Sequence, residues 1–330
     1  MNLRLVMMGS GRFALPTFHG LSASGHDVVG LFTQPDRTGR GHHRHRNPMK
    51  ESAVAEAIPV FQPENINTPH SVATLRSLQA DLCVVAAYGQ ILSAEVITTP
   101  RLGAINLHAS LLPRYRGASP VHYAILNGER ETGVTIFQIE PKLDAGPILG
   151  VERTGIGTKE TTGELEDRLA HLAVPLTLRV VDEIAQGTTR PRPQKSDAVT
   201  KAPSLRKAAG LIDWSKPTDS ILNHIRAMQP WPNPFSFLDQ AENELLRTLI
   251  LDVEPVADDG DECEPGMVVC GESGRLLVKT GDAVLEILQL RPEGKRTMTA
   301  AEFLRGHPLK PGDRFVSNRP TRDTTSETAR

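Results

Sequence analysis

The sequence has few cysteines, no long apolar run and little net charge. Three cysteines in 330 residues, with no C-x-x-C pair, argue against structural disulfides and a cysteine-based metal site. The N-terminal apolar run is too short for a signal peptide, and no stretch approaches the ~18 apolar residues of a membrane span. We therefore expect a cytoplasmic protein without a membrane partner. The formal net charge of −2 means that any nucleic-acid site must be a local basic patch.

Apolar strands alternate with helical segments over the first half of the chain. The expected strands are 3–8, 28–33, 60–61, 82–86 and one that ends at His108, and the expected helices are 13–22, 47–57, 71–77 and 161–186. This alternation predicts an α/β fold with a Rossmann-like parallel sheet, whose ligands bind beyond the carboxyl ends of the strands. Residues 132–138 and 148–154 are expected to add two edge strands.

Composition divides the chain into four parts. Residues 1–187 form the expected α/β domain, and 188–208, rich in proline and charge without periodicity, are expected to be a linker. In 209–316 a helix precedes short strands with glycine turns, which predicts a small C-terminal β-barrel of the OB-like kind. The polar segment 317–330 is expected to be a disordered tail.

Three polar side chains form a candidate catalytic group. Asn106 and His108 end an apolar strand two residues apart, so both point to one side of it, and Asp144 lies in a later loop bounded by glycine. An amide, an imidazole and a carboxylate are the groups needed to move an acyl group. They bind the oxyanion, carry a proton, and set the charge and orientation of the imidazole, respectively.

The first glycine motif supports a different hypothesis. Residues 9–14 read Gly-Ser-Gly-Arg-Phe-Ala between a strand and a helix, and Asp36 follows the second strand, where a ribose-binding acid would lie. A nicotinamide-dependent oxidoreductase is therefore an alternative. The same turn could instead serve only to join the strand to the helix. A third possibility is an RNA-binding module without catalytic activity.

Residues 106–113, Asn-x-His-x-Ser-Leu-Leu-Pro, with Leu-Asp-x-Gly at 143–146, resemble the folate-dependent formyltransferases. The run Thr-Gln-Pro-Asp-Arg at 33–37 strengthens the resemblance. Ser10-Gly11 departs from the family's Thr-Pro, and Tyr115 from its usual Trp. The resemblance implies catalysis by Asn106, His108 and Asp144, 10-formyltetrahydrofolate as co-substrate, and neither a metal nor NAD(P). It also implies that two loops wall the folate pocket. The pocket residues are Tyr88, Gly89, Ser110, Leu111, Leu112 and Pro113.

Segments 212–214, 226–232 and 294–300 resemble the tRNA-specific members of this family. This implies transfer of the formyl group to the α-amine of methionine on initiator tRNA, for translation initiation, by a protein that we expect to be monomeric. A 10-formyltetrahydrofolate hydrolase and a small-molecule formyltransferase are the alternatives within the superfamily.

A basic loop follows the second strand. Residues 37–50 contain four Arg, one Lys and three His, and no acidic residue. Such a loop suits contacts with tRNA phosphates, although it could also be a solvated loop without a partner. The residues expected to contact tRNA are Arg37, Arg40, Arg44, Arg46 and Lys50. The alternative is that the basic residues of the linker contact the tRNA instead. With no cysteine or acid nearby, the three histidines do not indicate a metal site.

Overall fold

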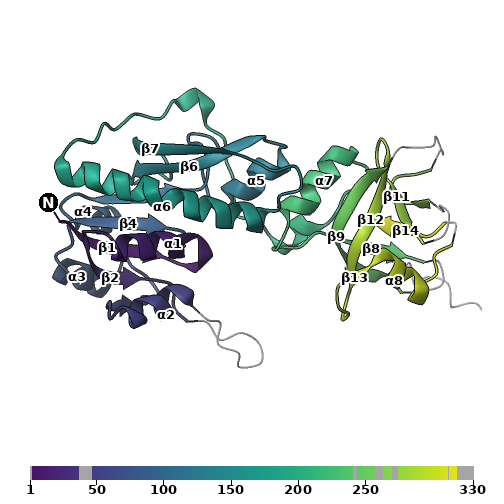
Figure 1. The fold of residues 1–330 in the computed structure, drawn as a ribbon, viewed down its shortest axis with the longest axis horizontal. Helices are drawn as coiled ribbons and strands as arrows, with labels where there is room; N and C mark the ends of the chain where they lie inside the picture. Colours follow the sequence, from purple (N-terminus) through teal and green to yellow (C-terminus); the bar gives the residue numbers. More distant parts are fainter. Residues whose placement is uncertain are drawn as a thin grey trace, which may run out of the picture. The chain divides into compact units, whose positions relative to one another are not determined.

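The computed structural model describes residues 2–36, 47–240, 244–256, 263–269, 274–310 and 312–317. The chain divides into two compact units (Figure 1). The first comprises Met1–Ala124, Glu129–Thr158 and Gly163–Ser204, and the second comprises Ile125–Gly128, Lys159–Thr162 and Leu205–Arg330. The expected linker is therefore divided, because its residues up to Ser204 belong to the first unit. The expected tail, apart from Ser317, lies outside the described residues.

The first unit is built on a seven-stranded sheet in the order β3-β2-β1-β4-β5-β6-β7. Its strands are β1 (Arg4–Gly9), β2 (Asp27–Phe32), β3 (Val60–Phe61), β4 (Leu82–Ala86), β5 (Ala104–His108), β6 (Glu131–Gln138) and β7 (Ile148–Gly155). Strands β1 to β5 pair in parallel, whereas β6 and β7 are antiparallel. The predicted α/β class is confirmed, and the sheet is mixed and mostly parallel.

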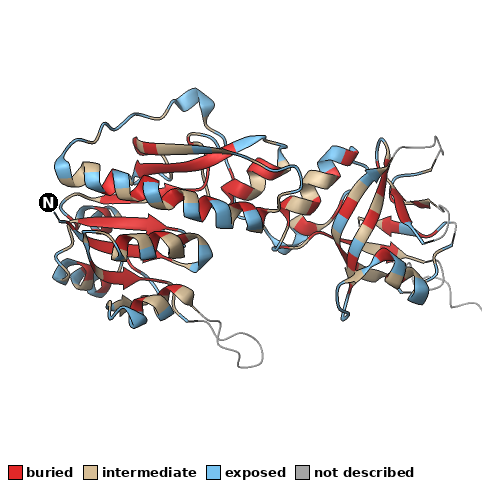
Figure 2. Cartoon of the chain, viewed as in Figure 1, coloured by how far each residue is buried: buried red, intermediate tan, exposed pale blue. Residues whose placement is uncertain are grey.

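Helices flank this sheet. They are α1 (Gly11–Ser22), α2 (Pro48–Ala55), α3 (Pro69–Ser77), α4 (Ala94–Thr98), α5 (Pro120–Leu126) and α6 (Thr162–Gln186). Side-chain caps fix where three of these helices begin. Asn47, Thr68 and Ser93 precede α2, α3 and α4, and each accepts a hydrogen bond from a backbone N–H of the first helical turn. Figure 2 shows the strands mostly buried and the helices buried along one side, as expected for amphipathic helices on an apolar sheet.

The glycine motif after β1 makes a tight strand-to-helix turn. A Cβ on Gly9 would lie 2.8 Å from the Cβ of Ala14, and Gly11 has a φ of 72°, so both positions favour glycine. Asp36, the acid of the dinucleotide hypothesis, accepts hydrogen bonds from Lys50 Nζ at 2.5 Å and Gln62 Nε2 at 2.9 Å. The motif is thus accounted for by the fold, and its acid is already paired.

The second unit is an antiparallel sheet in the order β10-β11-β12-β9-β8-β14, with β13 beside β12. Its strands are β8 (Phe235–Asp239), β9 (Leu246–Val256), β10 (Val268–Val269), β11 (Leu276–Lys279), β12 (Val284–Pro292), β13 (Met298–Thr299) and β14 (Arg314–Val316). An antiparallel bridge between Met267 and Arg314 joins the two ends of the sheet. The sheet therefore closes into the predicted barrel.

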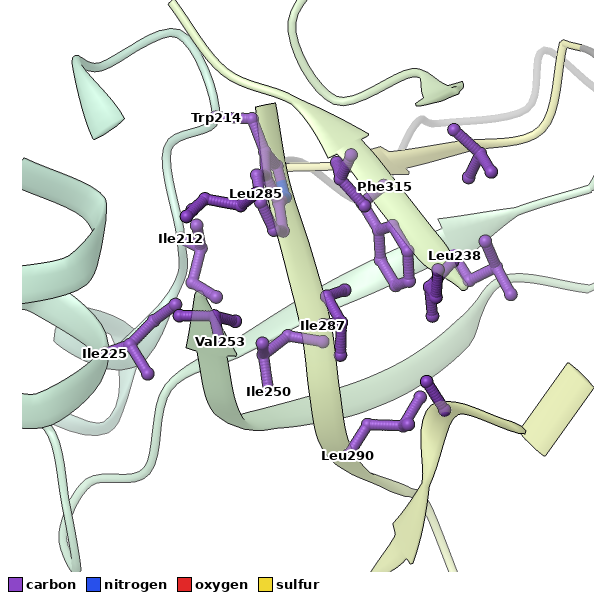
Figure 3. Packing of buried hydrophobic residues seen from close by; sticks show 14 of the residues in the cluster. Ile212, Trp214, Ile225, Leu238, Ile250, Val253, Leu285, Ile287, Leu290 and Phe315 are labelled. Atoms are coloured by element: carbon purple, nitrogen blue, oxygen red, sulfur yellow. The ribbon is translucent and has the colours of Figure 1, made fainter. Parts of the chain in front are cut away.

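Buried side chains fill this barrel (Figure 3). Helices α7 (Thr218–Ala227) and α8 (Ala300–Gly306) contribute Ile225 and Phe303 to the same apolar cluster. Trp214 is buried, and its indole N–H donates to Ser236 Oγ at 3.0 Å, which in turn donates to the carbonyl of Val316 at 3.0 Å. The one polar atom of this large side chain is therefore satisfied inside the core.

In the part of the chain that the structure describes, no helix is long and apolar enough to cross a bilayer. Likewise, within the described ranges no three His, Cys, Asp or Glu side chains gather where a metal ion could be held. The three histidines of the basic loop, His42, His43 and His45, lie outside those ranges.

Candidate active site

Strand β5 presents Asn106 and His108 on one face of the sheet. In the register of the sheet, Leu107 pairs with Ile136 and Ile136 with Gly150, and a Cβ on Gly150 would touch α6. Paired residues share a face and neighbours along a strand alternate. Asn106 and His108 therefore point away from α6, as their spacing predicts.

The tautomer of His108 is set by a backbone carbonyl. Its Nε2 lies 2.8 Å from the carbonyl oxygen of Tyr115, and a carbonyl can only accept, so Nε2 carries the hydrogen. The other ring nitrogen, Nδ1, lies 3.9 Å from Asp144 Oδ2. Nδ1 is thus the atom that can gain and lose a proton.

The charge of the His108 ring follows from its surroundings. Burial lowers the pKa of His108 below its ordinary value, and the nearby Arg116 guanidinium acts in the same direction. Asp144 and the carbonyl of Tyr115 oppose this shift of the pKa but do not overcome it. In the free protein the ring is therefore neutral at neutral pH, and Asp144 favours the charged form that arises when Nδ1 takes a proton.

Asp144 is held in a tight loop between β6 and β7. Its φ is 49°, and its Oδ2 accepts the backbone N–H of Gly117 at 2.8 Å. A Cβ on Gly146 would overlap the carbonyl oxygen of Gln138, so the loop lies too close to β6 for any other residue there. The carboxylate consequently has a defined position beside His108.

The carboxamide of Asn106 is available to a ligand. Asn106 is partly buried, and its side chain makes no hydrogen bond to another residue that the structure describes. Its amide is not one of the buried unpartnered polar atoms among the described residues, so it stays open to solvent in the free protein. Its N–H groups can instead bind an oxyanion beside His108.

The Ser-Leu-Leu-Pro turn contains two buried residues and two partly buried ones. Ser110 and Leu112 are buried, and the Thr135 hydroxyl donates to the Ser110 carbonyl at 2.6 Å and accepts from Leu112 N at 3.1 Å. Leu111 and Pro113 are partly exposed. The proposed folate contacts of this turn are thus left to Leu111, Pro113 and backbone atoms.

In the other expected pocket loop, the Tyr88 ring is buried in the core, and burial raises the pKa of its hydroxyl to about 12. Its carbonyl accepts Gln34 Nε2 at 2.8 Å. Gly89 is exposed and has a φ of 81°. Contact with folate here therefore remains a prediction, for the backbone around Gly89 more than for the Tyr88 side chain.

The structure describes one of the five residues expected to contact tRNA. Lys50 forms an ion pair with Asp36, so its charge is partly offset. The four arginines, at positions 37, 40, 44 and 46, lie outside the described residues, and their role stays a prediction.

One residue at the site was not anticipated. Gln194, in the expected linker, donates through Nε2 to the carbonyls of Asp144 and Gly146 at 2.9 and 2.8 Å. Its Oε1 accepts from Arg116 at 3.1 and 2.7 Å. A lone glutamine in an aperiodic segment carries no sequence signal that would have singled it out.

An imidazole and a free carboxamide on one sheet face, with a loop carboxylate beside the imidazole, are the groups that acyl transfer requires, so fold and site define an enzyme of acyl-group transfer. The Formyl transferase family model matches residues 1–181, and the Formyl transferase C-terminal domain model matches 204–308. The chain belongs to the formyl transferase family. This membership replaces the nicotinamide oxidoreductase and RNA-binding-module hypotheses.

Relatives that match over nearly their full length identify the group within this family. The chain is 44% identical over 315 residues to the methionyl-tRNA formyltransferase of Acidiphilium cryptum, covering 95% of this chain and 100% of the relative. It is 41% identical over 308 residues to that of Methylococcus capsulatus, covering 93% and 98% of the two chains. Within the formyl transferase family, the chain therefore belongs to the methionyl-tRNA formyltransferases.

Solved structures share the fold at low identity. HypX from Aquifex aeolicus in complex with tetrahydrofolic acid matches with a TM-score of 0.61 and 17% identity, covering 96% of this chain and 51% of that one. This chain thus spans about half the length of HypX. The N-formyltransferase from Helicobacter canadensis, crystallised with folinic acid and dTDP-3-aminofucose, matches with a TM-score of 0.62 and 17% identity, covering 86% and 98% of the two chains.

Proposed function

We propose that this protein transfers the formyl group of 10-formyltetrahydrofolate to the α-amino group of methionine on initiator tRNA. The observation that carries the proposal is the buried His108–Asp144 pair beside the unpaired amide of Asn106, in a chain that belongs to this family. Folate and charged tRNA are the substrates, and side chains of the protein transfer the proton and bind the oxyanion.

In the first half of the reaction, the amine nitrogen forms a bond to the formyl carbon. Asn106 donates hydrogen bonds to the oxygen that becomes negatively charged. Nδ1 of His108, neutral in the free protein, takes the proton that the amine loses. Asp144, 3.9 Å from Nδ1, stabilises the imidazolium that results.

In the second half, the bond between the formyl carbon and the folate nitrogen breaks. His108 returns its proton to that nitrogen, and the carbonyl forms again as the oxyanion collapses. The products are tetrahydrofolate and formylmethionyl-tRNA, and His108 is neutral once more. Nε2 stays hydrogen-bonded to Tyr115 throughout, so the ring need not turn.

An assay with the three possible formyl acceptors, which are charged initiator tRNA, water and a free amine such as methionine, tests the proposal. We expect labelled formyl to move from the folate to charged initiator tRNA, with little free formate and no transfer to free methionine. Formate release that does not depend on tRNA would make the protein a hydrolase, and transfer to a free amine would make it a small-molecule formyltransferase. NAD(P)H absorbance is followed in parallel.

The basic loop is the proposed grip on tRNA. Arg40→Ala should impair use of charged tRNA and leave folate binding unchanged. Neutralising Arg44, Arg46 and Lys50 together should weaken tRNA binding and flatten its salt dependence by nearly one unit of log–log slope per lost phosphate contact. Because Lys50 is paired with Asp36, we expect its share to be the smallest.

A second charge-neutralised variant serves as the comparison for this loop. It carries alanine at Arg190, Lys195 and Lys201 of the segment between residues 188 and 208. Loop variants that keep the parent's tRNA affinity and salt slope, while this variant loses both, would assign the grip to that segment instead.

A further inference from the structure

We propose that residues 192–202 form a strap that positions the catalytic groups, and that Gln194 is its central positioning residue. The strap lies in the segment whose sequence predicts a linker. The inference rests on the proposed transfer reaction, because it assigns these residues a part in that chemistry. Three sets of contacts within the first unit carry it.

The strap is joined to the site by backbone hydrogen bonds at both of its ends. Arg192 and Ile148, the first residue of β7, exchange two bonds of 2.8 and 2.9 Å. Ten residues later the strap pairs with the loop that follows the Ser-Leu-Leu-Pro turn. There Arg116 N donates to Thr200 O at 2.9 Å, and Ala202 N donates to Arg116 O at 2.7 Å. Ala202 is fully buried.

Between these ends, Gln194 ties two catalytic loops together. Its two amide hydrogens reach the carbonyls of Asp144 and Gly146, and its oxygen accepts from the Arg116 guanidinium. All of its strong hydrogen-bonding groups are used. The same side chain thereby fixes the backbone that carries the Asp144 carboxylate and the guanidinium that lowers the pKa of His108.

The strap also holds the carbonyl that sets the His108 tautomer. Tyr115 N donates to Thr200 Oγ1 at 2.8 Å, and the Tyr115 carbonyl accepts from His108 Nε2. Tyr115 has a φ of 61°, an unfavourable conformation that needs support from its surroundings. Two residues further on, Gly117 has a φ of 122°, and a Cβ there would lie 2.5 Å from the carbonyl oxygen of Ala202.

Both neighbours of the His108 ring therefore depend on the strap, Asp144 on the Nδ1 side and Tyr115 on the Nε2 side. A displacement of about 1 Å at a reacting group can lower a rate by about 10²-fold even when the changed residue is remote from the chemistry. Loss of the Gln194 contacts is expected to displace the groups around His108 and so lower the rate of transfer, although Gln194 itself does not contact the substrate.

The test uses full-length variants and single-turnover formyl transfer at saturating substrates. We expect Gln194→Leu to lower the rate by about tenfold to 10²-fold with the folate dissociation constant unchanged. Gln194→Glu keeps an acceptor for Arg116 but sets a carboxylate against the two carbonyls, so it should lose rate as well. The matched control is Ser196→Ala, an exposed change on the same strap.

A second readout does not depend on activity. The titration of His108, followed by NMR of the labelled imidazole, should move to lower pH in Gln194→Leu. The variant loosens both Asp144, which raises the pKa of His108, and Arg116, which lowers it, and Asp144 has the larger effect of the two. Thr200→Val, which removes the acceptor for Tyr115 N while keeping the side-chain shape, should also lower the rate. If Gln194→Leu and Thr200→Val both match Ser196→Ala in rate and in His108 titration, the strap has no positioning role. A parent protein that transfers no formyl group refutes the proposed function, and the titration still decides the strap.

Discussion

Replacing His108 by alanine is expected to lower the single-turnover rate of formyl transfer by about 10²–10³-fold or more, the range for loss of a positioned catalytic group. Nδ1 is the atom placed to carry the proton from the attacking amine to the departing folate nitrogen, and alanine removes it. Folate binding, which the proposal assigns to the neighbouring loops, should change little by calorimetry.

His171→Ala is a matched control for this variant, because His171 is exposed on α6, which lies on the sheet face opposite to His108. It should keep the parent's rate. A His108→Ala protein that transfers formyl at a near-native single-turnover rate would show that the proton follows another path, and the mechanism proposed above would then be wrong.

Replacing Asp144 by asparagine should lower the plateau rate by about 10²-fold and also move the pH profile. The carboxylate raises the pKa of His108, so its loss lets burial lower that pKa further. The reaction needs neutral His108 as its first base, so the rate rises as pH increases through the pKa of this group. The rising limb should consequently shift to lower pH in Asp144→Asn, while the plateau falls because the imidazolium has lost its partner.

Glu140→Gln provides the comparison, since it removes a carboxylate from the same loop at an exposed position. This variant should keep the parent's pH–rate profile, with the same position of the rising limb and the same plateau rate. A limb that moves to higher pH in Asp144→Asn, or an unchanged plateau, would show that Asp144 neither raises the pKa of His108 nor supports its charged form.

Sequence patterns predicted the α/β unit well because each strand of the parallel sheet is a short apolar run that local alternation reveals. The placement of Asn106 and His108 on one face followed from their spacing along β5. The antiparallel direction of β6 and β7 and the short helix α5 were not predicted, since neither has a distinct local signature.

The supporting contacts of the site were beyond the reach of such patterns. Gln194 lies 50 residues from Asp144 and 78 from Arg116, and Thr200 lies 85 residues from Tyr115. A single glutamine or threonine in a proline-rich segment has the composition of a linker whether or not it packs against a domain. The role of such a residue depends on which part of the fold the segment packs against, and only the folded structure shows this.

The closure of the barrel has a consequence for how the chain folds during synthesis. Ser236, in β8, donates to the Val316 carbonyl in β14 across 80 residues of chain, and the bridge between Met267 and Arg314 likewise involves the last described strand. Pairings this distant must overcome loop-closure entropy before they add stability, so they form slowly. The second unit therefore cannot complete its sheet until residue 316 has left the ribosome. The strap, which ends at residue 202, is synthesised long before, so the catalytic unit can fold first, while the barrel of a nascent chain stalled between these points stays open.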